Sequence, residues 1–260
     1  MFRLFARTPA VSERRMFAFS LEDGSTIDVV LHRHPRARRI KLSVDERGAR
    51  LTLPTRASER MALEFLQAHR GWLEAHWRGL QADAAPPLQP GSTRALPLRG
   101  VDAAIDWRSA RLTRLQPGAG DRLVFDVRGL QQDMSPTPAV HRALRDFYEA
   151  QARADIARWL PKYAGGLPRP PSRIVLKRMS SQWGSLSPAG VVALDLSLVL
   201  ARPSAFEYVL VHELCHLIHH DHSPAYWHEV EARWPAWREE RDYLHAEGRR
   251  LKSTLRALLG

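Results

Sequence analysis

Five histidines fall within eleven positions of the segment VHELCHLIHHDHS, which spans residues 211–223. His212 and His216 are four residues apart, and in an α-helix that spacing places two side chains on one face, with Cβ atoms about 6 Å apart. Two imidazoles so placed can bind one metal ion, and Glu213 can reach a water on that ion from the side. This H-E-x-x-H arrangement is typical of zinc hydrolases, in which the metal lowers the pKa of the water and the glutamate takes its proton.

The residues around this motif predict a buried helix over 204–219. Ser204 and Glu207 are spaced as a capping box, so we expect the helix to begin there. A helix walled by apolar side chains favours a metal site over two surface histidines beside a solvated glutamate. The apolar side chains recur at helical spacing, at Phe206, Val209, Leu210, Leu214 and Leu217.

The third protein ligand is expected from chain that has already turned back. His219 lies on the same helical stripe, but it stands about 10 Å from His212 along the axis, and three ligands in a row cannot easily close a tetrahedron. His222 fits better, because the next helix is expected to begin directly after it. Ser223 is a good N-cap, and Pro224 suits the first helical position.

The set predicted to bind one Zn²⁺ ion is therefore His212, His216 and His222. Their spacing equals that of the metzincin signature H-E-x-x-H-x-x-G-x-x-H, although a histidine replaces the metzincin glycine and no Met-turn is recognisable. A carboxylate on the following helix, from Glu229 or Glu231, is the alternative third ligand.

Hydrophobic patterning predicts an α+β fold. Residues 16–32 have the pattern of a β-hairpin around Asp23 and Gly24, and residues 38–53 repeat it, which indicates an antiparallel sheet with one solvated face. Ser58 can cap a helix that runs to about Leu80. The N-terminal region is thus expected to be an antiparallel sheet with one helix.

The stretch 83–97, rich in proline and glycine, predicts a loop or linker, and 132–139, which contains two prolines, predicts a second break. We therefore expect a mostly-β region with one helix over residues 1–135 and a zincin-like catalytic core of helices and a sheet over residues 136–260. Within that core we expect a helix over 139–160 and strands over 172–179 and 190–199.

Composition indicates which partners and which cellular compartment to expect. The net charge of +11 suggests an anionic partner such as a nucleotide or DNA. Cys215 is the one cysteine, so the chain forms no internal disulfide, and a reducing compartment is expected. The first residues lack the continuous apolar segment of a secretory signal, and no run approaches the roughly 18 apolar residues of a membrane span. We expect a cytoplasmic protein with no membrane segment.

Segments of the C-terminal half resemble a known family. They are HELCHL at 212–217, DHSPAYW at 221–227 and WPAWRE at 234–239, preceded by IVLKRMSSQWGSLS at 174–187. These segments resemble the YgjP-like metallopeptidase family, which is related to the WLM and SprT-like zinc proteins. The N-terminal strands also fit that family.

The resemblance implies a zinc-dependent peptidase-type fold in which Glu213 is the catalytic base. It implies the ligands His212, His216 and His222. Two positions depart from the family. Leu186 stands where the family has a cysteine after Trp-Gly-Ser, and Asp195 stands where an asparagine is usual.

The sequence therefore predicts a zinc metallopeptidase that acts on peptides or proteins, with Glu213 as general base. The alternatives are a metal-dependent phosphohydrolase acting on nucleotides, a DNA-associated SprT-like protease, and a structural zinc clip. The clip would need a fourth ligand such as Cys215 or His219, although Cys215 is better explained as a packing residue.

Two further groups of residues allow both a functional and a structural interpretation. The sequence Trp183-Gly184-Ser185 could line a substrate groove beside a strand that pairs with an extended peptide, or it could form a tight turn with the indole in the core. Tyr226 and His228 could donate a hydrogen bond to the oxyanion of the reaction. Packing is the better explanation for Tyr226.

Overall fold

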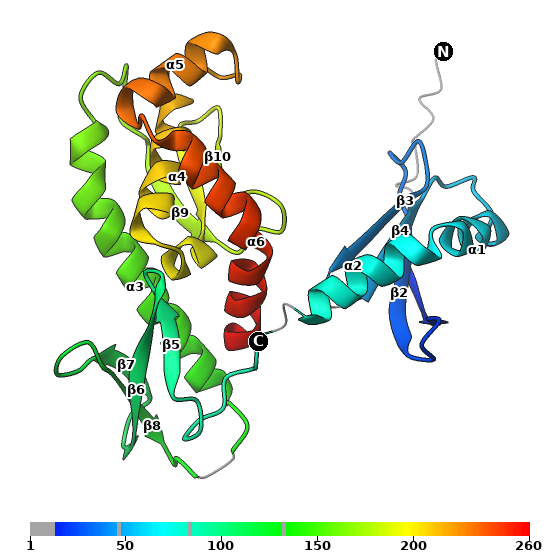
Figure 1. Cartoon of the computed structure of the whole chain (residues 1–260), viewed down its shortest axis with the longest axis horizontal. Coiled ribbons are helices and arrows are strands. Elements are labelled where there is room, and N and C mark those ends of the chain that lie inside the picture. The colour runs from blue at the N-terminus through cyan, green and yellow to red at the C-terminus, as the bar shows by residue number, and fades with distance from the viewer. Residues whose placement is uncertain (1–13, 46–47, 83–84, 132–133) are drawn as a thin grey trace, which may run out of the picture. The chain divides into compact units, whose positions relative to one another are not determined.

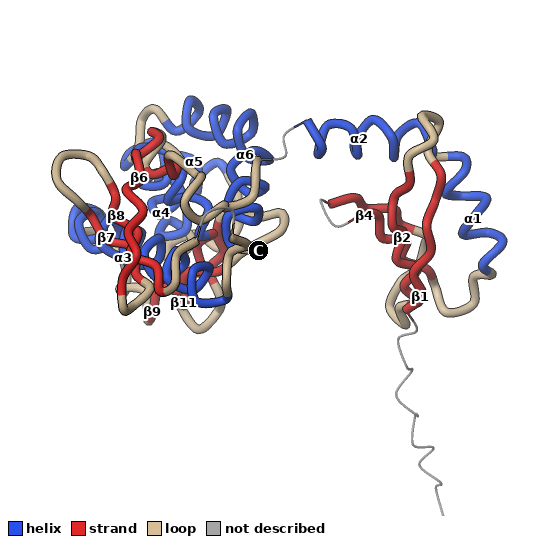
Figure 2. The backbone as a smooth tube through the Cα atoms, turned by 90° about the horizontal axis from the view of Figure 1, so that it is seen from below, coloured by secondary structure: helices blue, strands red, loops and turns tan. Residues whose placement is uncertain are grey.

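The structure, a computed structural model, describes residues 14–45, 48–82, 85–131 and 134–260. The start of the chain, the centre of the predicted second hairpin turn and parts of both predicted linkers therefore lie outside the described residues. The chain divides into two compact units, one up to Ala84 and the other from Ala85 to Gly260 (Figures 1 and 2). Our predicted boundary at residues 135 and 136 falls inside the second unit. As a division into functional domains, it stays a prediction.

The first unit is a four-stranded sheet with two helices. Its strands are β1 (Arg14–Ser20), β2 (Thr26–Arg33), β3 (Lys41–Asp45) and β4 (Gly48–Leu53), in the order β1-β2-β4-β3. The β1–β2 and β3–β4 pairs are antiparallel, whereas β2 and β4 run parallel, so the sheet is mixed where we expected an antiparallel one. Alternate side chains of β2, such as Ile27 and Val29, are buried, as the period of a strand requires.

The predicted single helix after Ser58 is divided in two. Ser58 caps α1 (Glu59–Ala68) as expected, by accepting a hydrogen bond from the amide of Met61. His69 then leaves helical geometry, with φ −108° and ψ 16°, and its ring stacks on Phe65. The chain continues as α2 (Arg70–Ala82).

The second unit contains two small sheets and four α-helices among its described residues. One sheet has the order β5-β6-β8-β7, and its strands are β5 (Ala95–Leu98), β6 (Val101–Ala110), β7 (Arg114–Pro117) and β8 (Leu123–Arg128). The other has the order β10-β11-β9, and its strands are β9 (Arg173–Lys177), β10 (Gly184–Leu186) and β11 (Val191–Asp195). The helices are α3 (Pro138–Tyr163), α4 (Pro203–Cys215), α5 (Pro224–Arg233) and α6 (Trp237–Leu259).

The second unit is built around the buried helix α4. This helix packs against α3, α5 and α6 and against strands β10 and β11 (Figure 1). Strand β11 ends at Asp195, earlier than predicted, because the Asp195 carboxylate accepts the amide of Ser197 and starts the 3₁₀ helix η1 (Leu196–Leu200). The α+β class is confirmed, and most of the motif-bearing helix is withdrawn from water.

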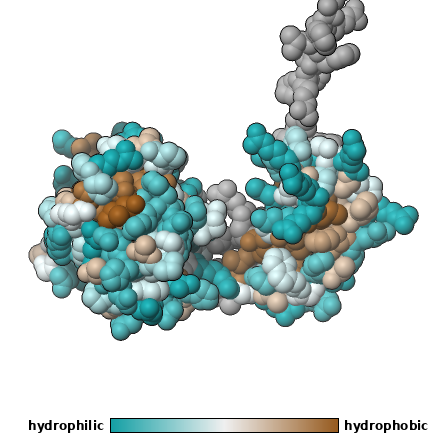
Figure 3. All heavy atoms as spheres, turned by 90° about the horizontal axis from the view of Figure 1, so that it is seen from above, coloured by the Kyte–Doolittle hydropathy of each residue, from teal (hydrophilic) through white to brown (hydrophobic). Residues whose placement is uncertain are grey.

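Hydrophilic residues cover most of the face of each unit that Figure 3 shows, and apolar residues gather there in small patches. Among the described helices, none combines the length and the apolar character that crossing a bilayer would require.

Candidate metal centre

Helix α4 begins and ends differently from our prediction. Its N-cap is Arg202, whose side chain makes no capping bond, and Pro203 opens the first turn, where its fixed φ suits a helix. The predicted capping box is therefore wrong, and Glu207 instead binds Lys162 and the hydroxyl of Tyr163. The helix also ends at Cys215 rather than at residue 219, because the amides of Leu217 and Ile218 bond to carbonyls three residues back instead of four.

The early end of α4 allows the chain to reverse direction within a few residues. His216 is the C-cap of the helix, and His222 lies just before α5. The predicted start of α5 is confirmed, because Ser223 accepts a hydrogen bond from the amide of Tyr226 and Pro224 is the first helical residue. His222 is thereby brought back toward the two histidines of α4.

The three predicted ligands converge on one point. One ring nitrogen from each of His212, His216 and His222 lies within 4.8 Å of the corresponding nitrogens of the other two. The Nε2 atoms of His212 and His222 are 3.3 Å apart. Two nitrogens bound tetrahedrally to one zinc ion, each at about 2.0–2.1 Å, would lie about 3.3 Å from each other. The spacing of His212 and His222 therefore fits two ligands of one zinc ion, and His216 lies close enough to be the third candidate.

Neighbouring groups fix the orientation of these rings. The Nδ1 of His216 donates to the backbone carbonyl of His219 at 3.0 Å, which leaves Nε2 free to bind a metal. The buried ring of Tyr226 stacks on His216, with centroids 4.5 Å apart, and its hydroxyl donates to the carbonyl of His212. Trp227 flanks the rings of His212 and His222 at 5.9 and 5.8 Å. Tyr226 is thus a packing residue that contacts both His216, through its ring, and His212, through its hydroxyl.

The electrostatics favour the neutral form of the imidazoles. Burial, followed by the neighbouring histidines and Arg241, lowers the pKa of His212 to about 3. Burial also lowers the pKa of His216. A neutral imidazole is the form that binds a metal.

Glu213 is buried with an unsatisfied oxygen. Its residue exposure is 4%, and among the described residues its Oε2 atom has no hydrogen-bond partner. Burial raises the pKa of its carboxyl to about 8. Gly184 of β10 lies against this carboxyl, since a Cβ at that position would stand 2.5 Å from Glu213 Oε1. A buried acceptor without a partner, one residue after a candidate ligand, suits a group that handles the proton of a water.

The other candidate ligands do not join the cluster in the described structure. Glu229 pairs with Arg233, and Glu231 pairs with Arg238. Cys215 is a buried free thiol, and burial raises its pKa to about 12, which suits a packing residue. His219 contributes its carbonyl through the bond to His216, and His228 lies exposed on α5.

Two neighbours of the cluster were missed from the sequence. Arg241 of α6 is exposed and forms no ion pair with a carboxylate of the described chain, and its guanidinium lies 5.8 Å from the Trp227 ring. Gly184 belongs to the singled-out Trp-Gly-Ser sequence, but its contact with Glu213 joins residues 29 positions apart. No local spacing could have revealed either contact.

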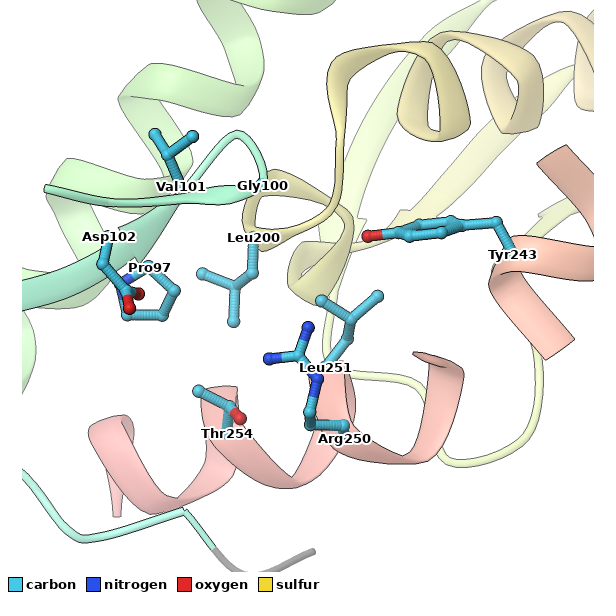
Figure 4. A pocket seen from close by; sticks show the side chains of 9 residues that line it. All are labelled: Pro97, Gly100, Val101, Asp102, Leu200, Tyr243, Arg250, Leu251 and Thr254. Carbon is cyan, nitrogen blue, oxygen red and sulfur yellow. The ribbon is translucent and has the colours of Figure 1, made fainter. Parts of the chain in front are cut away.

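A separate hollow of about 150 Å³ lies between the β5–β6 turn and α6. Figure 4 shows Pro97 and Asp102 on one side of it and Arg250 and Thr254 on the other. It includes none of the predicted ligands and not Glu213, so we assign it no part in the chemistry.

One comparison with known proteins covers most of the chain. The model of a family described as "YgjP-like, metallopeptidase domain" matches residues 38–247. No curated protein sequence matches this chain. A crystal structure of the metallopeptidase zymogen of Pyrococcus abyssi abylysin is similar, with 21% identity over 38% of this chain and 93% of that chain. Its TM-score of 0.30 is too low for any conclusion about the fold.

Proposed function

This chain belongs to the YgjP-like metallopeptidase family, and from that membership we propose that it is a zinc-dependent peptidase with Glu213 as general base. One observation carries the proposal, namely that three imidazole nitrogens lie within 4.8 Å of one another and that the residue after the first of them, Glu213, has a buried carboxyl whose Oε2 has no partner in the described chain. The proposed ligands are His212, His216 and His222.

The protein side chains have defined parts in the proposed reaction. Zinc would lower the pKa of a water and polarise the scissile carbonyl. Glu213, held against Gly184, accepts the proton of the attacking water and returns it to the leaving amine. The ring of Tyr226 and the carbonyl of His219 hold His216 in the orientation and tautomer that present its Nε2.

The position of strand β10 supports a peptide substrate. This strand forms the edge of its sheet, since it pairs with β11 on one side and is last in the order β10-β11-β9. It packs against α4, and its first residue, Gly184, contacts Glu213. An extended peptide could add to this edge by main-chain hydrogen bonds and so bring a scissile amide to the carboxyl.

The position of Arg241 favours a second candidate, a metal-dependent phosphohydrolase that acts on nucleotides. A cation near a divalent metal site weakens metal binding unless an anion lies between them. The Arg241 guanidinium lies 5.8 Å from the ring of Trp227, which flanks His212 and His222, and among the described residues no carboxylate pairs with it. A substrate phosphate would complement both charges.

Metal analysis combined with a substrate panel tests the proposed function. We expect purified protein to carry about one zinc per chain. We expect it to cleave unstructured proteins such as casein, to lose this activity with 1,10-phenanthroline and to regain it when zinc is added back. Nucleoside triphosphates in the same panel test the second candidate. A protein that binds no zinc, or whose hydrolysis ignores the chelator, would refute both.

A methyl group at Gly184 should impair catalysis without removing the metal. In Gly184→Ala the added Cβ meets Glu213 Oε1 at 2.5 Å, so the carboxyl must move. A displacement of about 1 Å can cost on the order of 100-fold in kcat/KM, which peptide cleavage assays would measure. Gly165→Ala is the matched control, because its Cβ meets nothing within 4 Å. Equal activity of the two variants would show that this contact does not place the carboxyl.

A further inference from the structure

Lys252 of α6 binds the chain segment that leads into β10. Its ammonium donates to the backbone carbonyls of Met179 and Gln182, at 3.0 and 2.7 Å. It also lies 4.5 Å from the centroid of the Trp183 ring. The side chain is only 11% exposed, and burial lowers its pKa while the nearby Asp195 carboxylate opposes that shift. Burial of an ammonium group costs free energy unless it gains hydrogen bonds or an ion pair. The contacts of Lys252 with this segment offset that cost.

Asp195 also binds this segment. Its Oδ2 accepts the amide of Met179 and lies 3.5 Å from the Lys252 ammonium. Its own amide donates to the carbonyl of Trp183 at 2.8 Å. The Asp195 residue is 2% exposed. Its carboxylate is therefore stabilised by the amides of Met179 and Ser197 and by the Lys252 ammonium rather than by water. The segment is therefore fixed at both ends, at Met179 and at Trp183.

Close packing transmits this restraint to the proposed general base. Gly248 of α6 lets the helix approach Trp183, because a Cβ there would stand 2.8 Å from the indole Cζ2. Gly184, the residue after Trp183, in turn lies against Glu213, since a Cβ at Gly184 would stand 2.5 Å from Glu213 Oε1. The chain is therefore closely packed from α6 through Trp183 and Gly184 to the Glu213 carboxyl, so a shift of residues 179–184 is expected to reach that carboxyl.

From these contacts we propose that Lys252, together with Asp195, is a positioning residue of the catalytic site, which holds residues 179–184 and thereby sets strand β10 against Glu213. This inference rests on the proposed peptidase function. Lys252 lies on α6, which carries none of the proposed ligands and not the general base. Its removal should therefore change substrate binding and turnover while the metal stays bound.

The test compares Lys252→Met with Lys252→Arg in the full chain. Methionine keeps most of the aliphatic stem but donates no hydrogen bond, whereas arginine keeps the charge and the donors. We expect amide hydrogen exchange over residues 179–186 to be about ten-fold faster in Lys252→Met, and KM for peptide to rise about ten-fold, because the carbonyls of the segment lose their charged donor. Zinc content should be unchanged, and Lys252→Arg should restore most of both values.

Lys162→Met is the matched control, because it removes another lysine bound to a largely buried carboxylate, that of Glu207 on α4. It should leave exchange over 179–186 and KM unchanged. The positioning role would be overturned if residues 179–186 of Lys252→Met exchanged their amide hydrogens at the wild-type rate. It would also be overturned if they exchanged faster while KM and turnover stayed unaltered. If the wild-type enzyme cleaves no peptide although it binds zinc, the proposed function fails, and the exchange comparison still decides whether Lys252 holds the segment.

Discussion

Replacing Glu213 with glutamine is expected to slow peptide hydrolysis by on the order of 10³-fold, a typical loss for a missing general base. The amide cannot accept the proton of the attacking water, although it nearly matches the carboxyl in size. Because the side chain is not among the three proposed ligands, the variant should still bind about one zinc per chain. Turnover at saturating substrate, measured with metal content on the same sample, tests both expectations.

The burial of Glu213 predicts that this variant folds well. Burial raises the pKa of the carboxyl to about 8, so in metal-free protein at pH 7 the group is largely protonated. Glutamine then replaces a neutral group rather than a charge, and thermal unfolding of the metal-free variant should resemble that of the wild type.

Glu207→Gln provides the contrast on the same helix. It removes a carboxylate that binds Lys162 and Tyr163, so it should lower thermal stability but leave turnover intact. Full hydrolysis by Glu213→Gln, or an equal loss of turnover in both variants, would contradict the role of Glu213 as general base.

Features that depend on neighbouring residues could be predicted from the sequence. Ser58 and Ser223 cap their helices because each is followed by residues that suit a first turn. The four-residue spacing of the two histidines on α4, and the turn expected before Ser223, correctly predicted that His222 returns to them. That these three side chains bind zinc stays a prediction.

Features that depend on distant contacts could not be predicted. The capping box at Ser204 was plausible by spacing, but Glu207 has a stronger partner in Lys162, which comes from another helix. The strand expected to continue past Asp195 ends there because that carboxylate binds donors from Met179 and Lys252 as well as Ser197. Lone charged residues such as Lys252 show no periodicity that would set them apart from solvated neighbours.

Replacing His222 with alanine is expected to weaken zinc binding by more than the roughly 10- to 100-fold that the loss of an outer-shell partner costs. In the described structure no other histidine, cysteine or carboxylate joins the cluster, so no protein group can replace the lost nitrogen. His222 is exposed and lies outside any helix, so its loss should leave the metal-free fold unchanged. Titration against a competing chelator measures the affinity directly.

The stabilisation of the fold by zinc gives an independent measurement of the same effect. A ligand at 100 times its Kd stabilises the native state by about 2.7 kcal/mol, so added zinc should raise the Tm of the wild type clearly. The rise should be small or absent in His222→Ala. His219→Ala is the control, because His219 supplies a carbonyl and not its ring to the cluster. If both variants bound zinc equally well, the third ligand would have to come from elsewhere, and the turn between α4 and α5 would have no part in holding the metal.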